Sequence, residues 1–193
     1  MRNLHAKLTL GAGVVVAAMT LSTTAWAHWP SENSQPICRS ISASLSATFF
    51  TEGCESEVGM CTAGDLTRRG GRVVGSTHYV ADGIGGGIIG EDSVVFPPVE
   101  PATTWTYAGI LRLITPLGEL QSSDAGILDT AGGIFTEFNR VQGGTGIFEG
   151  ASGTFYINGT TLADGSGFDA EITGEVCVTS LLAAAKMRLI FAP

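Results

Sequence analysis

The chain has 193 residues, a formal net charge of -8 at pH 7 and 44% hydrophobic residues. Beyond the first few residues, positive charge is concentrated only at Arg68, Arg69 and Arg72. Proteins bind nucleic acids largely by releasing phosphate counterions with basic side chains, so this composition indicates that nucleic acid is not a partner. A net negative charge of this kind is more typical of a secreted protein, in which it favours solubility.

The first segment has the features of a secretory signal. Positive residues precede an apolar run from Leu8 to Leu21, and "AWA", which ends at Ala27, has the small-x-small pattern of a cleavage site. We therefore expect a signal peptide over 1–27 and a single domain over 28–193, secreted or periplasmic and free of the membrane after cleavage. The alternative is a retained membrane anchor, for which the run is short.

The strands are predicted from period-two patterns. In "ICRSISASLSATFF", Ile37 to Phe50, apolar residues alternate with hydroxyl residues, which is typical of a strand with one dry and one wet face. No long helical pattern with caps precedes residue 180. Short strands separated by glycine-rich turns predict an all-β sandwich or barrel. The further predicted strands are 72–81, 105–115, 119–128, 134–141, 153–161 and 168–179, with a tight turn at 116–118.

Two segments fit no strand pattern. Residues 83–104 are rich in glycine and proline and predict a long loop, which either covers a site or is a surface excursion. The tail over 181–193 is apolar and fits either a short helix or a last strand.

No cofactor or metal is expected. "GGGIIG", from Gly85 to Gly90, has the spacing of a dinucleotide-binding loop, but Pro97 and Pro98 follow where a helix would have to run. Four cysteines behind a signal predict two disulfides. Zinc ligation is the alternative, but the spacing from Cys54 to Cys61 is wide for it and no histidine lies near.

The stretch "GGTGIFEGASGTFYINGT", from Gly143 to Thr160, combines glycines with aromatic residues. Glycines in strands mark bulges, bends or close approach, and aromatics between them can fill a barrel. The pattern G-G-T-G-x-F-x-x-A-x-G resembles the motif of plant dirigent proteins and allene oxide cyclases. The segments "TEGC…GMCTAGDL", "GILDTAGGIFTEF" and "EITGEVC" resemble bacterial secreted barrels of the allene oxide cyclase-like type.

This resemblance covers roughly residues 37–178 and implies an eight-stranded antiparallel barrel with a small apolar cavity. It also implies a dimer or trimer, and an activity that guides a reactive, mostly apolar intermediate to one stereoisomer. The plant motif carries two arginines at positions that are Glu149 and Ser152 here. We expect an all-β antiparallel barrel of about eight strands.

The disulfide pairing follows from this barrel. Cys38 and Cys177 both lie on the wet faces of their strands, and barrel closure brings the first and last strands together. We therefore predict the pairs Cys38–Cys177 and Cys54–Cys61.

Two function classes remain open, and polar groups on the dry face would separate them. One is a non-catalytic module that binds a small apolar molecule; the other is a cofactor-free isomerase or cyclase, which needs a shaped pocket and one or two polar groups. The candidate catalytic residues are Asp124 and Arg39. Asp124 lies on the same face of its predicted strand as Leu120 and Leu128, and Arg39 interrupts the apolar face of the strand over 37–50. Their alternative role is a structural Arg39–Asp124 pair. The candidate ligand-binding residues are Tyr107, Tyr79, Leu111 and Phe148.

Overall fold

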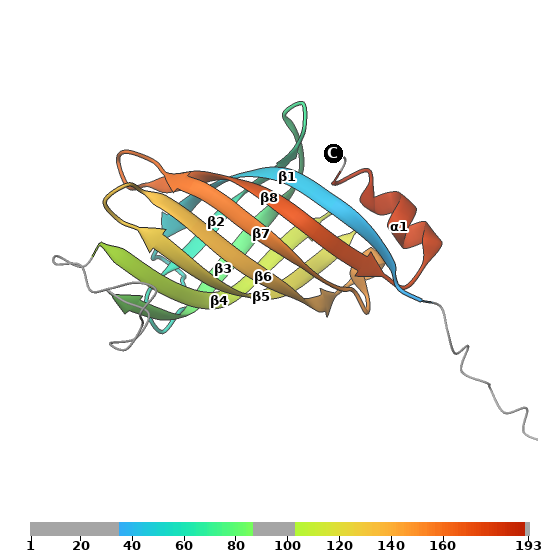
Figure 1. The fold of residues 1–193 in the computed structure, drawn as a ribbon, viewed down its shortest axis with the longest axis horizontal. Coiled ribbons are helices and arrows are strands. Elements are labelled where there is room, and N and C mark those ends of the chain that lie inside the picture. Colours follow the sequence, from blue (N-terminus) through green and yellow to red (C-terminus); the bar gives the residue numbers. More distant parts are fainter. Residues whose placement is uncertain (1–34, 87–102, 192–193) are drawn as a thin grey trace, which may run out of the picture. The chain divides into compact units, whose positions relative to one another are not determined.

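The structure is a computed structural model that describes residues 35–86 and 103–191 (Figure 1). The expected signal peptide over 1–27 and most of the expected long loop lie outside these ranges. Within them, no helix is both long enough and apolar enough to cross a membrane. The elements are β1 (Ile37–Phe50), β2 (Cys61–Arg68), β3 (Arg72–Gly86), β4 (Thr104–Thr115), β5 (Gly118–Asp129), β6 (Ile134–Gly144), the 3-10 helix η1 (Gly146–Phe148), β7 (Ser152–Thr161), β8 (Gly167–Val178) and α1 (Leu181–Met187).

The eight strands form a closed antiparallel barrel in which each strand pairs with the next in sequence (Figure 1). Pairing of β1 with β8 closes the ring in a register that runs from Ile37 opposite Val178 to Thr48 opposite Gly167. Closure leaves no strand edge unpaired. The prediction of an all-β barrel of about eight strands is confirmed.

The alternation in β1 sets its two faces. Ile41, Ala43, Leu45 and Ala47 point inward and are buried, while the serines between them point outward. A strand with this pattern buries its apolar side chains in only one register, because a shift of one residue would turn every side chain to the other face.

The strand pair β4–β5 forms the predicted hairpin. Thr115 faces Gly118, and the side chain of Thr115 accepts a hydrogen bond from the backbone of Leu117 at 3.2 Å. The predicted loop over 83–104 is wrong at its start, because β3 continues past a bulge at 81–83 and ends at Gly86. A bulge absorbs one extra residue, so pairing with β4 resumes beyond it.

The tail after β8 is a helix, which resolves the choice that the sequence left open. The Ser180 side chain caps α1 by accepting from the backbone of Ala183 at 3.1 Å. Helix α1 lies at the end of the barrel where β1 begins and β8 ends (Figure 1). Met187 and Phe191 are buried there, and the rings of Phe191 and Phe148 lie 6.4 Å apart. These side chains close this end of the barrel.

Both predicted disulfides are present. Cys38 is bonded to Cys177 across the β1–β8 seam, and Cys54 is bonded to Cys61 across the connection that leads into β2. No cysteine among the residues that the structure describes is free. Disulfides of this kind are typical of an oxidising compartment outside the cytosol.

Candidate functional site

The interior of the barrel holds a cavity of about 250 Å³. It lies toward the end opposite α1, since its wall includes the last part of β1 and the first part of β8. Two residues of that wall, Phe49 and Trp105, are 39% and 42% exposed. The described part of the barrel is therefore open at this mouth.

Aromatic and aliphatic side chains form most of the cavity wall. Among the described residues that line it, Glu137 is the only carboxylic acid, and no lysine, arginine or histidine contributes. Cavities of this composition suit an apolar molecule, whose orientation is fixed by a few polar groups. The aromatic residues of the wall are Phe49, Tyr79, Trp105, Tyr107, Phe135 and Phe168.

Glu137 is held by hydrogen bonds to both of its carboxyl oxygens. Tyr107 Oη donates to Oε2 at 3.3 Å, and Asn139 Nδ2 donates to Oε1 at 2.7 Å. Ser122 Oγ donates to Asn139 Oδ1 at 2.8 Å, so the amide of Asn139 is hydrogen-bonded at both ends. Asn139 and Ser122 are almost fully buried. The network therefore positions one carboxyl group at the cavity wall.

Glycines on the barrel wall make room for the two tyrosines. Tyr107 on β4 faces Gly126 on β5, which in turn faces Glu137 on β6. A Cβ at position 126 would collide with the Tyr107 ring and its Oη. The phenol lies across the glycine and so reaches the carboxyl group on the strand beyond. A Cβ at Gly109 would likewise lie 2.8 Å from Tyr79 Oη.

Asp124 lies one cross-strand row deeper than Glu137, opposite Gly109 and Asn139. Its inward parity was predicted correctly, since it is only 8% exposed. Neither carboxyl oxygen meets the geometry of a hydrogen bond with a described residue. Tyr79 Oη lies near enough to influence its pKa, but it too satisfies no hydrogen bond in this arrangement.

Burial changes the protonation of these groups. Desolvation raises the pKa of Asp124 to about 7. Desolvation, followed by the charge of Asp124, raises the pKa of Glu137 to about 8, although Asn139 and Tyr107 oppose the change. Burial also raises the pKa of both Tyr79 and Tyr107, which keeps the phenols neutral. The interior thus holds two carboxyl groups whose pKa values lie near neutral pH.

The structure brings together some of the predicted site residues and separates others. Tyr79, Tyr107 and Leu111 all line the cavity. Phe148 does not; it lies in η1 and packs against Phe191 at the closed end.

Arg39 does not pair with Asp124. Its Nη1 donates to the backbone carbonyl of Cys38 at 3.5 Å. Within residues 35–86 and 103–191, the only ion pair joins Arg112 to Glu119 at 3.7 Å. The predicted alternative of a structural Arg39–Asp124 pair is therefore wrong. Which side chains meet inside a barrel depends on the stagger between its strands. Knowing that two residues both point inward does not define that stagger.

Sequence reasoning missed Glu137 and its partner Asn139. Both share a parity with Phe135 and Val141 in "IFTEFNRV", which β6 turns inward. The available signal was that two polar residues alternate in register with Phe135 and Val141 within the predicted strand 134–141, because polar groups on an apolar strand face require partners.

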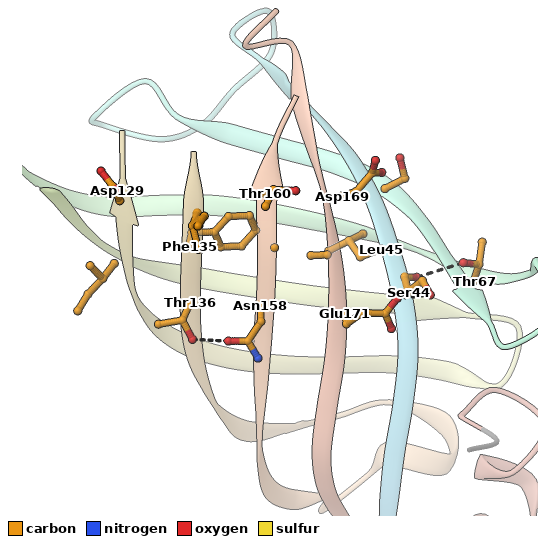
Figure 2. A pocket seen from close by; sticks show the side chains of 15 residues that line it. Ser44, Leu45, Thr67, Asp129, Phe135, Thr136, Asn158, Thr160, Asp169 and Glu171 are labelled. Carbon is orange, nitrogen blue, oxygen red and sulfur yellow. Dashed lines mark hydrogen bonds between the residues drawn. The ribbon is translucent and has the colours of Figure 1, made fainter. Parts of the chain in front are cut away.

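A larger hollow of about 950 Å³ lies against the outer wall of the barrel (Figure 2). Four of its polar side chains form two hydrogen-bonded pairs. Thr136 Oγ1 donates to Asn158 Oδ1 at 2.6 Å, and Ser44 Oγ donates to Glu171 Oε1 at 2.8 Å. The hollow lies on the outside of the barrel, whereas the interior cavity has on its wall Glu137, a carboxyl group with a raised pKa. We therefore take the interior cavity as the candidate site.

A scan of the chain against protein-family models and a search of the curated proteins found no match.

Proposed function

We propose that this protein binds one small, mainly apolar molecule in the interior of its barrel. The observation that carries the proposal is the cavity of about 250 Å³, whose wall is almost entirely aromatic and aliphatic. Water is a poor occupant of such a space, since a stable buried water needs two to four polar partners. An apolar ligand would bury its surface there and be oriented by Glu137 and Tyr107.

The place of action that we propose is outside the cytosol, either secreted or periplasmic. The two disulfides support an oxidising compartment. The signal-like pattern of residues 1–27 supports export. The resemblance of the glycine-aromatic motif to allene oxide cyclase-like and dirigent-like barrels agrees with a ligand-holding cavity. It also supports a proposed dimer or trimer.

Native mass spectrometry of protein purified from the culture medium of its own cells tests the binding proposal. We expect a retained small molecule, with the number of subunits visible in the same spectrum. The variant Leu111→Trp should lose this molecule, because the larger ring fills the cavity. Ile114→Trp is the matched control on the same strand, since Ile114 is 41% exposed on the outer wall. Equal retention by both variants would contradict the proposal.

A second candidate function is that of a cofactor-free isomerase or cyclase. The observation that favours it is the pair of carboxyl groups, Glu137 and Asp124, with pKa values raised to about 8 and about 7. Groups that titrate near the working pH are suited to proton transfer. The recovered ligand and its isomers, incubated with the protein and with Glu137→Gln, would test this. Conversion by the protein and a loss of about a hundredfold in the variant would support catalysis; no conversion would exclude it for that ligand.

A further inference from the structure

The cavity holds carboxyl groups, and no positive side chain lines it that could balance their ionised forms. Glu137 lies on its wall, and Asp124 lies in the row behind. None of the described residues that line the cavity is basic, and the one side-chain hydrogen bond that Arg39 forms with a described residue joins its Nη1 to the backbone carbonyl of Cys38. Charged groups in protein interiors are normally paired, because an isolated buried charge is costly. Among the described residues, no basic side chain forms an ion pair with Glu137 or Asp124.

The hydrogen bonds of Glu137 indicate which chemical group of a ligand would suit this position. Both of its oxygens accept hydrogen bonds, from Tyr107 and from Asn139. In this arrangement Asn139 Oδ1 accepts from Ser122 Oγ, which leaves the Asn139 Nδ2 group directed at Glu137. Donors on both carboxyl oxygens favour the ionised form of Glu137, which would attract a cation.

The rings of the cavity suit the same partner. Tyr107 lies beside Glu137, with Trp105, Phe135 and Phe168 nearer the mouth. The faces of aromatic rings carry negative electrostatic potential and attract organic cations, most strongly when water is excluded. A neutral apolar molecule would gain only the burial of its surface, whereas a cation would also interact with the rings and with the carboxyl groups.

We propose that the cavity recognises a small apolar molecule that carries a permanent or protonated ammonium group, with its charge placed against Glu137 and its apolar body against the aromatic rings. This inference rests on the proposed function, because it names the ligand class of the same cavity.

Binding of such a cation would be linked to proton release. The groups that face one another here are Asp124, Glu137, Tyr79 and Tyr107, with Asp82 further out on β3. Near pH 7, Asp124 and Glu137 retain protons because their pKa values are raised to about 7 and about 8. A bound cation stabilises the ionised forms, so those protons leave when it binds. The affinity for a cation should therefore increase as the pH rises through this range.

Benzyltrimethylammonium and neopentylbenzene form a suitable pair of probes. The two have the same shape, and only the first is charged, at every pH. We expect calorimetric titration at about pH 9 to show binding of the cation about tenfold or more tighter than binding of the neutral probe. We also expect the ratio of the two affinities to fall by about tenfold at pH 6. Near pH 7, where Asp124 and Glu137 still hold protons, titration in two buffers of different ionisation enthalpy should show proton release when the cation binds. Binding of the neutral probe should release none.

The variant Glu137→Gln should lower the ratio of cation to neutral affinity by about tenfold or more. Glu171→Gln is the matched control, because Glu171 lies on the outer wall, and it should leave the ratio unchanged. If the neutral probe binds as tightly as the cation and no proton is released, the charge assignment is overturned while the proposed cavity binding stands. If neither probe binds, the proposed function is contradicted together with the inference. The proton-release measurement needs no variant and stays decisive if Glu137→Gln fails to fold.

Discussion

Tyr107 on β4 donates a hydrogen bond from Oη to Glu137 on β6, at 3.3 Å, although β5 lies between the two strands. The bond exists because the residue between them in the same row, Gly126, has no side chain. A phenol is thereby aligned with a buried carboxyl group at the wall of an aromatic cavity. A barrel interior filled with apolar side chains alone would have no such hydrogen-bonded pair, and this pair is what marks the cavity as a candidate site.

Replacing Tyr107 with phenylalanine should raise the pKa of Glu137 above its value of about 8. The hydroxyl donates to Glu137 and so favours the ionised form, and its removal leaves desolvation less opposed. A carbon-13 titration of the Glu137 carboxyl group by NMR measures this directly. Tyr156→Phe is the control, because Tyr156 is 49% exposed on the outer wall. An unchanged pKa in Tyr107→Phe would show that the hydrogen bond does not form in solution.

The free energy of unfolding should fall as the pH rises from about 4 to about 8. In the unfolded chain Asp124 and Glu137 ionise near 3.8 and 4.5, whereas in the barrel they ionise near 7 and 8. Across this range the folded state therefore holds more protons than the unfolded state, and each increase in pH favours unfolding. Above about pH 8 both states are ionised and the contribution of this pair becomes constant.

Urea unfolding at a series of pH values measures this slope. The double variant Asp124→Asn, Glu137→Gln should make it flatter, while Glu171→Gln, on the outer wall, should not. Since no described residue forms a hydrogen bond with Asp124 that Asn would lose, Asp124→Asn alone should not destabilise the barrel above pH 8. A loss of about 3–5 kcal/mol in that variant would instead reveal a charged partner.

Helix α1 should stabilise the barrel by closing one end. Met187 is 1% exposed, and Met187→Ala should lower the free energy of unfolding by about 2–5 kcal/mol. Leu182 lies in the same helix but is 65% exposed, so Leu182→Ala should change it by less than about 0.5 kcal/mol. Equal effects in urea unfolding would mean that α1 does not pack against the barrel.

The two disulfides should contribute unequally. Cys38 and Cys177 are 139 residues apart, whereas Cys54 and Cys61 are only 7 apart. In the chain-entropy description, replacing the first pair with serines should cost about 4–5 kcal/mol and replacing the second about 2–3 kcal/mol. Urea unfolding of the two double variants checks the order. A larger cost for the short loop would contradict the entropic explanation.

The barrel was predictable because its strands alternate regularly. In β5 the alternation runs without interruption through Asp124, so its inward direction followed from the pattern of its neighbours. The pairing of Cys38 with Cys177 followed from the same parity, once the first and last strands were assumed to meet.

The site itself was predictable only in part. Tyr79, Tyr107 and Leu111, which the sequence suggested as ligand-binding residues, line the cavity, but their contacts depend on strand stagger and on single glycines such as Gly126. Phe148 belongs to a turn that packs at the closed end, because η1 interrupts the strand pattern after Gly144. The alternation therefore predicted which side chains point inward, but not which of them meet.

The most direct test of cavity binding is a methyl NMR titration of the full chain with neopentylbenzene, a neutral apolar probe. We expect saturable shifts for the methyl groups on the cavity wall, and none for Ile127 and Ile134 on the outer wall. Shifts confined to the outer wall, or no saturable shift at any methyl group, would contradict it. The cavity methyl groups that should shift are those of Leu45, Leu111, Leu128 and Ile157.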